Sequence, residues 1–234
     1  MVYPVDVIIP ARDECETIAG VVREIPRAWV RSVTVVDNGS RDGTAEVARR
    51  AGAQVVHEPL AGYGRACLRA LEALPHDGVV VFLVADGSDD PRELPRVVDP
   101  VLEGRADLVI GSRFQGWVAP GAMPPWQSMG SRVAALGLRL RFGQSVSDLG
   151  PFRAISRPAL DGLAMRDPTY GWTLEMQIKA ARQGLRVREV PVAWRQRRGG
   201  SPKVAGTLKG TLGASAMISR WLYGAFRGPE HDPR

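Results

Sequence analysis

The feature that most constrains this chain is an uncharged apolar run at residues 79–85, which ends at three carboxylates, Asp86, Asp89 and Asp90. A continuous β-branched run of this length is typical of a central parallel strand that is covered on both faces. Ligands of open α/β sheets bind just beyond the carboxyl ends of such strands, so we expect Asp86 at a functional edge. The competing interpretation is a strand-to-helix turn in which Asp89 or Asp90 caps a helix that starts near Pro91.

Two earlier apolar runs end in the same way. Residues 5–9 lead through a proline into Asp13 and Glu14, and residues 33–36 lead directly to Asp37. One such ending is ordinarily a cap or an Asx turn. Three of them in consecutive strand-helix units indicate a shared cleft at one edge of a sheet.

The periodicity of the whole chain supports this arrangement. Strands are expected near 5–9, 32–37, 53–57, 78–85 and 107–111, and helices near 15–25, 44–51, 64–74 and 92–103. This alternation predicts an α/β fold with a mostly parallel central sheet covered by helices. Beyond residue 116 we expect a loop, a helix at 127–142, a strand at 152–156, a helix at 172–183, a strand at 187–192 and an amphipathic C-terminal helix or helix pair at 203–226.

Length and composition indicate one cytoplasmic domain. The chain has 234 residues, of which 44% are apolar and 24% charged, so it can bury one substantial core. The start of the chain has no basic and apolar leader pattern, and no apolar stretch approaches the ~18 residues that span a bilayer. Cys15 and Cys67 have no metal-binding spacing and are expected to be reduced core residues.

Charge divides the chain into two halves. Residues 1–115 carry 18 acidic and 13 basic side chains, a balance of −5, whereas residues 116–234 carry 7 acidic and 18 basic ones, a balance of +11. The basic half suits an anionic partner such as a diphosphate, a lipid phosphate or the anionic inner face of the plasma membrane. We expect no nucleic-acid partner, because no DNA- or RNA-binding module accompanies the charge.

Six short segments occur in an order and spacing that resemble the family 2 glycosyltransferases, which carry the GT-A fold. They are IPARDE at 9–14, VDNGSRDGT at 36–44, GYGRA at 62–66, ADGSDDP at 85–91, IGSRF at 110–114 and GSPKVAGT at 200–207. The branch that the chain most resembles contains dolichyl-phosphate mannose synthase and bacterial polyprenyl-phosphate sugar transferases. The resemblance implies a nucleotide diphosphate sugar donor, Mg²⁺ or Mn²⁺, and inversion at the anomeric carbon.

The resemblance also divides the single domain, 1–234, by role. It implies a nucleotide-sugar half at 1–115, an acceptor half with a basic loop at 116–207, and an amphipathic tail at 208–234. The residues that it implies at the nucleotide are Pro10, Ala11, Glu14, Asp37, Gly64, Arg65 and Asp86. For Glu14 the alternative is a helix-dipole partner, and for Gly64 and Arg65 the expectation is that backbone N–H groups at a helix start approach the nucleotide.

The metal-binding motif departs from the family pattern. The family usually carries Asp-x-Asp, but this chain has Val84 in place of the first acid and keeps Asp86 as the main ligand. Because Mg²⁺ and Mn²⁺ accept substrate phosphates and waters in most positions, one carboxylate can suffice, with Ser88 or Asp89 as a second contact. We therefore expect metal to bind weakly unless nucleotide is present.

On the acceptor side, the resemblance implies an acid near the transferred sugar. Asp148 is the first candidate and Glu175 the second, and for both the alternative is pairing with a nearby arginine. The residues expected at the diphosphate or acceptor are the cations Arg113, Arg195, Arg197, Arg198 and Lys203, together with the hydroxyl of Ser201. The alternative for this group is a solvated basic loop with membrane affinity, and the two roles are compatible.

The sequence thus predicts a metal-dependent hexosyltransferase with a donor of the UDP-glucose or GDP-mannose type. The acceptor that we expect is polyprenyl phosphate, and the alternative is a small soluble hydroxyl compound. A nucleotidyltransferase is disfavoured, because the basic glycine-rich loop expected after its first strand is absent. A non-catalytic nucleotide-sugar or lipid-binding protein is the remaining alternative, and Val84 is its best support.

Overall fold

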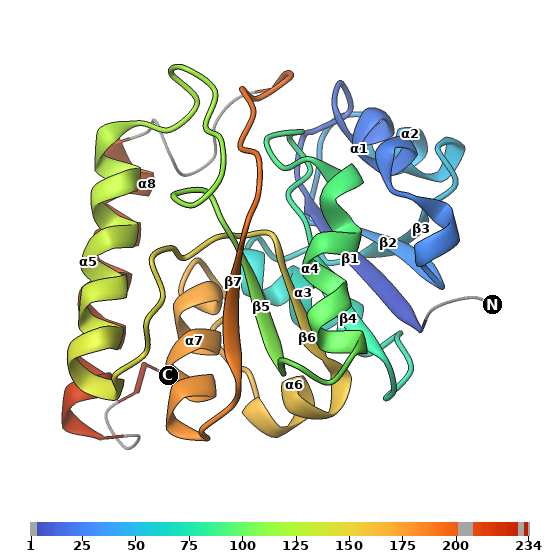
Figure 1. Cartoon of the computed structure of the whole chain (residues 1–234). Helices are drawn as coiled ribbons and strands as arrows, with labels where there is room; N and C mark the ends of the chain where they lie inside the picture. The colour runs from blue at the N-terminus through green and yellow to red at the C-terminus, as the bar shows by residue number, and fades with distance from the viewer. Residues whose placement is uncertain (1–3, 201–207, 229–231, 234) are drawn as a thin grey trace.

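The computed structural model describes residues 4–200, 208–228 and 232–233, and the seven strands among them form one sheet (Figure 1). The strands are β1 (Val5–Ala11), β2 (Ser32–Asp37), β3 (Gln54–His57), β4 (Val79–Phe82), β5 (Leu108–Ser112), β6 (Arg153–Ser156) and β7 (Val187–Pro191). The helices are α1 (Ile18–Glu24), α2 (Thr44–Arg50), α3 (Tyr63–Leu71), α4 (Leu94–Leu102), α5 (Pro125–Phe142), α6 (Arg157–Leu163), α7 (Trp172–Arg182) and α8 (Leu208–Arg227), with short 3₁₀ turns at Arg27–Trp29 and Pro91–Glu93.

The sheet is mostly parallel, as predicted. Its strand order is β3-β2-β1-β4-β6-β5-β7, and β6 alone among these strands runs antiparallel to its neighbours. Parallel pairing of β1 with β2 and with β4 brings the carboxyl ends of these three strands to one edge. The three acid-ended segments predicted to share a cleft therefore do start from adjacent strands.

Helices cover both faces of the sheet, which explains the continuous apolar runs of its central strands. Side chains of β4 alternate between the faces: Val79 and Val81 pack in the cluster with α1, α2 and α4, whereas Val80 and Phe82 pack in the cluster with α3, α6 and α7. The ring of Phe82 meets the edge of Trp172, with ring centroids 6.1 Å apart. The α/β class predicted from the sequence, with a mostly parallel central sheet covered by helices, is confirmed by this layered arrangement.

A third apolar cluster joins α5 and α8, which lie side by side at one edge of the molecule, to α7 (Figure 1). Ala134 and Leu138 of α5 pack there with Trp221 of α8. The C-terminal helix is confirmed, but its expected apolar surface is only partly present. Trp221, a large apolar residue of this helix, is 1% exposed and donates from Nε1 to Asp167 Oδ2 at 2.8 Å.

An exposed apolar stripe lies on α5 instead. We call it the α5 face, and its members recur at intervals of three and four residues: Trp126, Met129, Val133, Leu136 and Leu140. Each is at least 46% exposed. Among the described helices, none combines the length and apolarity needed to cross a bilayer.

Two details differ from the predicted elements. Helix α6 was not expected, because Pro158 and Gly162 weaken the helical signal of a seven-residue segment. The strand expected at 78–85 stops at Phe82, since the N–H of Val84 donates to Asp89 Oδ2 at 3.1 Å rather than to a neighbouring strand.

Candidate active site

A cavity of about 650 Å³ opens at the carboxyl edge of β1, β2 and β4. One side is lined from the first half of the chain, by Pro10, Ala11, Arg12, Glu14, Asn38, Ala61, Gly62, Tyr63, Val84, Ala85, Asp86 and Ser88. We call this the donor side. The other side, which we call the acceptor side, is lined mainly by Arg113, Trp126, Leu149, Tyr170, Leu174, Trp194, Met217 and Ile218. The cavity therefore joins the two halves that charge distinguished in the sequence.

Asp86 lies on the donor wall, in the turn that follows β4. Its Oδ1 accepts hydrogen bonds from the N–H of Ser88 at 2.9 Å and from the Ser88 hydroxyl at 2.6 Å, which fixes the carboxylate. Its Oδ2 faces the cavity and accepts from Arg197 Nη1 at 2.8 Å. Asp86 thus lines the cavity, as expected of a residue that would bind a metal ion, and Ser88 orients its carboxylate.

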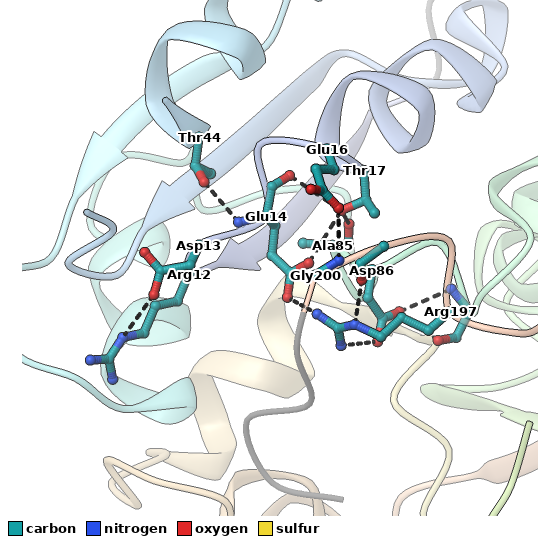
Figure 2. Close-up of polar contacts among 12 residues, drawn as sticks. Arg12, Asp13, Glu14, Glu16, Thr17, Thr44, Ala85, Asp86, Arg197 and Gly200 are labelled. Carbon is teal, nitrogen blue, oxygen red and sulfur yellow. Dashed lines mark hydrogen bonds and ion pairs between the residues drawn. The ribbon is translucent and has the colours of Figure 1, made fainter. Parts of the chain in front are cut away.

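Glu14 lies beside Asp86, in the turn between β1 and α1. The N–H of Glu14 donates to Thr44 Oγ1 at 2.8 Å, and the Thr17 hydroxyl donates to Glu14 Oε2 and to Ala85 O (Figure 2). These bonds tie the turn after β1 to the first residue of α2 and to the turn after β4. The carboxylate of Glu14 then reaches Arg197 through Oε1.

Arg197 connects the two carboxylates across the cavity wall. Its guanidinium donates from Nη1 to Asp86 Oδ2 and from Nη2 to Glu14 Oε1 (Figure 2). Its Nε donates to Gly199 O at 2.6 Å. The space between the Asp86 and Glu14 carboxylates therefore favours a positively charged group. Of the arginines expected at the diphosphate, Arg197 and Arg113 line the cavity.

The two other arginines of the same loop point elsewhere. Arg195 pairs with Glu24 Oε2 at 2.9 Å and with Asp90, and Arg198 pairs with Glu24 Oε1 at 2.7 Å. Neither lines the cavity, so the expectation that they contact the diphosphate is not met in this structure. They fasten the loop instead. Ser201 and Lys203 lie outside the described residues.

Asp37 is turned away from the cavity. Its Oδ1 accepts from the Ser40 N–H at 3.1 Å, and its Oδ2 lies 3.1 Å from His57 Nδ1. The next residue, Asn38, lines the cavity and holds the loop after β3 by donating to Glu58 O and Leu60 O. Asn38 was missed, although its position directly after the acid at a strand end was a usable signal.

Gly64 and Arg65 do not offer their N–H groups to the cavity. These groups donate to Thr169 O and Pro168 O, at 3.2 and 3.0 Å. A Cβ added to Gly64 would lie 1.8 Å from Asp167 O, so glycine is required here for close packing of α3 against the loop before α7. The predicted nucleotide contact is replaced by a packing role.

Asp148 forms a buried ion pair with Arg113, as the alternative interpretation held. Arg113 donates from Nε to Oδ2 at 2.8 Å and from Nη2 to Oδ1 at 2.6 Å, and its guanidinium carbon lies 4.9 Å from the centroid of the Trp194 ring. Burial by itself raises the pKa of Asp148, but the hydrogen bonds and charge of Arg113 outweigh it and hold the pKa below its usual value. The carboxylate does not line the cavity, so the base role is not supported by its position.

Glu175 is also fully enclosed. Its two oxygens accept from the N–H groups of Arg166 and Asp167, both at 2.8 Å, and Lys179 Nζ lies 2.7 Å from Oε1. The carboxylate of Glu175 thus pairs with a lysine and with backbone N–H groups, not with the arginine that the alternative interpretation named. These contacts hold the loop before α7, and Glu175 does not reach the cavity.

Asp89 is buried beneath the donor wall, not in it. Oδ2 accepts from the Val84 N–H, and Oδ1 has no hydrogen-bond partner among the described residues. Burial raises the pKa of Asp89 to about 7, although the Val84 bond opposes this. The expected metal contact from Asp89 is therefore not available. Asp90 caps the 3₁₀ turn at Pro91–Glu93, as the competing interpretation predicted.

The donor wall fits a divalent cation only in part. Asp86 and Glu14 supply two nearby carboxylates, while Val84 contributes an apolar surface where the family motif has an acid. In the described part of the chain, no three His, Cys, Asp or Glu side chains gather closely enough to hold a metal. Mg²⁺ and Mn²⁺ suit such a site when substrate phosphates complete the coordination shell.

Comparisons with known proteins agree with this geometry. The model of glycosyl transferase family 2 matches residues 6–163. An uncharacterized glycosyltransferase of Mycobacterium tuberculosis is 39% identical over 218 residues, covering 93% of this chain and 96% of that protein. An undecaprenyl-phosphate mannosyltransferase of Micrococcus luteus is 33% identical over 230 residues, covering 92% of each chain.

A solved structure extends the comparison to bound ligands. Glucosyl-3-phosphoglycerate synthase from Mycobacterium tuberculosis, in complex with Mn²⁺, UDP-glucose and phosphoglyceric acid, superposes with a TM-score of 0.74 at 26% identity, covering 99% of this chain and 81% of that one. It confirms the GT-A fold predicted from the sequence. A family model matching well over half of the residues, and relatives similar along nearly their full length, place this chain in glycosyl transferase family 2.

Proposed function

We propose that the protein transfers a sugar from a nucleotide diphosphate donor, in the presence of a divalent cation, to an acceptor held on the far side of the same cavity. The observation that carries this proposal is the pair of carboxylates, Asp86 and Glu14, which face the cavity with a cationic side chain seated between them. Mg²⁺ or Mn²⁺ bound there with the donor would neutralise the charge of the departing diphosphate.

The protein's own residues divide the remaining tasks. Pro10, Ala11 and Asn38 line the part of the donor side that is closest to β1 and β2, where we place the nucleoside. Arg197 is the cation best placed to contact the diphosphate. Catalysis then rests on positioning and on charge neutralisation, and we expect inversion at the anomeric carbon, as the family resemblance implies.

The first candidate acceptor is a small soluble compound that presents a hydroxyl. Its support is the superposition with a synthase that was solved with UDP-glucose and phosphoglyceric acid. Such an acceptor needs a base, and neither Asp148 nor Glu175 reaches the cavity. In an inverting transfer the acceptor attacks from the face opposite the leaving diphosphate, so the donor's own phosphate oxygens cannot serve as this base.

Polyprenyl phosphate is the second candidate, and a separate observation favours it. The acceptor side is walled largely by apolar side chains, including Trp126 of α5 and Met217 and Ile218 of α8. A phosphate monoester is already an anionic nucleophile near neutral pH, so it needs no base from the protein. The similar protein of Micrococcus luteus is an undecaprenyl-phosphate mannosyltransferase.

The α5 face suits the second candidate as well. It adjoins the acceptor side through Trp126, and Arg132, Arg139 and Arg141 are exposed on the same helix. Residues 108–147 contain no Asp or Glu, so nothing on this stretch repels anionic lipid. An amphipathic helix with apolar and arginine side chains is typical of reversible contact with an anionic bilayer.

The deciding experiment is a matrix of donors and acceptors. UDP-glucose and GDP-mannose, each with Mn²⁺, are incubated with phosphoglycerate or with a short-chain polyprenyl phosphate, and products are identified by mass spectrometry and their anomers by NMR. Product with one acceptor alone selects that candidate. Binding of nucleotide sugar without product from either acceptor would favour the non-catalytic alternative, and a protein that binds no nucleotide sugar contradicts the proposal.

A further inference from the structure

We infer that the Arg197 guanidinium and a divalent cation compete for the same two carboxylates, so that metal enters this site only together with the nucleotide diphosphate. The inference rests on the proposed donor site. It concerns the order in which that site is filled, which the proposed reaction leaves open.

The contacts of Arg197 define the competition. Each terminal nitrogen of the guanidinium bonds a different carboxylate: Nη1 donates to Asp86 Oδ2 at 2.8 Å, and Nη2 donates to Glu14 Oε1. The side chains of Arg197, Asp86 and Glu14 are 23%, 19% and 7% exposed, so the two ion pairs are partly shielded from water. Charge-assisted bonds of this kind are among the strongest that a side chain makes.

A free divalent cation gains little by entering. To reach Asp86 Oδ2 it has to displace Nη1, and the displaced guanidinium would remain beside it as an uncompensated positive charge. Val84 stands where the family motif has an acid, so a further carboxylate that could hold the metal is missing. The guanidinium therefore protects the site against metal alone.

A diphosphate changes this balance because it offers new acceptors to both cations. Its oxygens can complete the metal's coordination shell and can also receive the released guanidinium, so neither positive charge is left unpaired. Thermodynamic linkage then requires metal and nucleotide to strengthen each other's binding by the same factor. Arg197 supplies a large part of that coupling.

The surrounding loop allows the exchange without a larger rearrangement. The N–H of Arg195 donates to Ser88 O at 2.7 Å and that of Arg198 donates to Asp86 O at 3.1 Å, so the backbone on both sides of Arg197 is bonded to the turn after β4. The neighbouring arginine side chains are paired with Glu24. The loop stays in place while the Arg197 side chain turns from the carboxylates to the diphosphate.

The test measures Mn²⁺ binding by electron paramagnetic resonance, with and without UDP, in the wild type and in three variants. In Arg197→Gln, binding of Mn²⁺ alone should tighten roughly tenfold or more, and the strengthening of Mn²⁺ binding by UDP should shrink by a similar factor. Arg197→Lys keeps the charge and should retain weak binding of Mn²⁺ alone. Arg198→Gln, the matched control from the same loop, should leave both values within about twofold of the wild type.

A second measurement uses the wild-type protein and does not depend on the stability of the glutamine variant. In ¹⁵N spectra of arginine side chains, the Nε signal of Arg197, identified by its loss in Arg197→Lys, should shift on addition of Mg²⁺ with UDP and stay in place with Mg²⁺ alone. Equal Mn²⁺ affinity in the wild type and Arg197→Gln, or an Nε signal that moves with Mg²⁺ alone, overturns the inference. Failure of UDP to bind under every condition contradicts the proposed function instead.

Discussion

Arg113 and Asp148 form a bidentate ion pair that is almost closed to solvent, with 4% and 0% of their side chains exposed. Removing one partner of such a pair leaves the other charge buried and uncompensated, so we expect Asp148→Ala to lower the free energy of unfolding by about 3 to 5 kcal/mol. Urea denaturation monitored by circular dichroism measures this loss.

The matched control for Asp148→Ala removes both charges. The double variant Arg113→Met, Asp148→Leu should recover most of the lost stability, because no unpaired charge remains. If Asp148→Ala instead keeps wild-type stability and loses turnover, Asp148 acts in catalysis and its pairing is secondary.

Replacement of Asp86 by asparagine should cut sugar transfer on the order of 100-fold, since it removes the carboxylate that would hold the metal and its diphosphate. The neutral side chain can still accept from Ser88, so the turn is retained. Turnover over a series of Mn²⁺ concentrations, with Glu72→Gln as an exposed control, measures the loss. Full wild-type activity in excess EDTA would exclude the metal role.

Asp37→Ala is expected to weaken nucleotide binding by about 1 to 3 kcal/mol, the usual effect of losing a charged hydrogen-bond acceptor. The effect on the nucleotide would be indirect: Asp37 accepts from the Ser40 N–H and so holds the turn in which Asn38 lines the cavity. Calorimetry with UDP and GDP measures the change. His57→Ala, which removes a 58% exposed side chain on the far side of Asp37, should leave the affinity unchanged. Equal losses in both variants would assign the effect to the pair rather than to the nucleotide pocket.

Asp89→Asn should change how stability depends on pH. Burial raises the pKa of Asp89 to about 7 in the folded state, against 3.8 for an ordinary aspartate, so the folded state retains a proton that the unfolded chain releases. The wild type therefore loses stability as pH rises from about 4 through about 7, by at most about 4 kcal/mol. Asparagine does not ionise, so the stability of the variant does not fall in this way as pH rises.

The pH experiment compares unfolding free energies of the wild type and Asp89→Asn at pH 5 and pH 8. We expect the stability advantage of Asp89→Asn over the wild type to be larger at pH 8 than at pH 5, because most of the wild-type loss falls between these two pH values. A difference that does not vary between these pH values would show that Asp89 is ionised in both states.

Vesicle binding should depend on the α5 face rather than on Trp221. Met129→Gln with Leu136→Gln is expected to reduce flotation with phosphatidylglycerol-containing vesicles roughly tenfold, because two exposed apolar anchors are lost. Leu60→Gln, at a side chain that is 59% exposed outside the α5 face, is the control. If the wild type ignores anionic vesicles, or forms a dimer that the same two substitutions abolish, the α5 face binds something other than lipid.

The sequence predicted the sheet well because its strands are short apolar runs that end abruptly in turns. Val79 to Phe82 alternates between two faces that are both buried, and the resulting continuous run was the strongest signal in the chain. Helix α6 was missed because seven residues with an internal glycine carry little periodic information. The burial of Trp221 was missed because its partner, Asp167, lies 54 positions earlier in the chain.

The candidate site was predicted less completely than the fold. Asp86, Glu14, Pro10, Ala11, Ser88, Arg113 and Arg197 do line the cavity, since strand ends and loop order place them there. Side-chain direction was not predictable: within one loop, Arg197 enters the cavity while Arg195 and Arg198 pair with Glu24. Such choices depend on acids contributed by distant helices, and local pattern does not reveal them.

The position of β6 also governs the order in which a chain leaving the ribosome can complete its fold. β6 lies between β4 and β5 in the sheet but is synthesised after both, so β5 cannot join the first four strands until residues 153–156 have emerged. Until then the nascent protein presents β4 as an open edge, a site prone to wrong pairing. In a newly made chain, the strands that carry the acids of the donor side can therefore pair first, and the acceptor side of the cavity forms last.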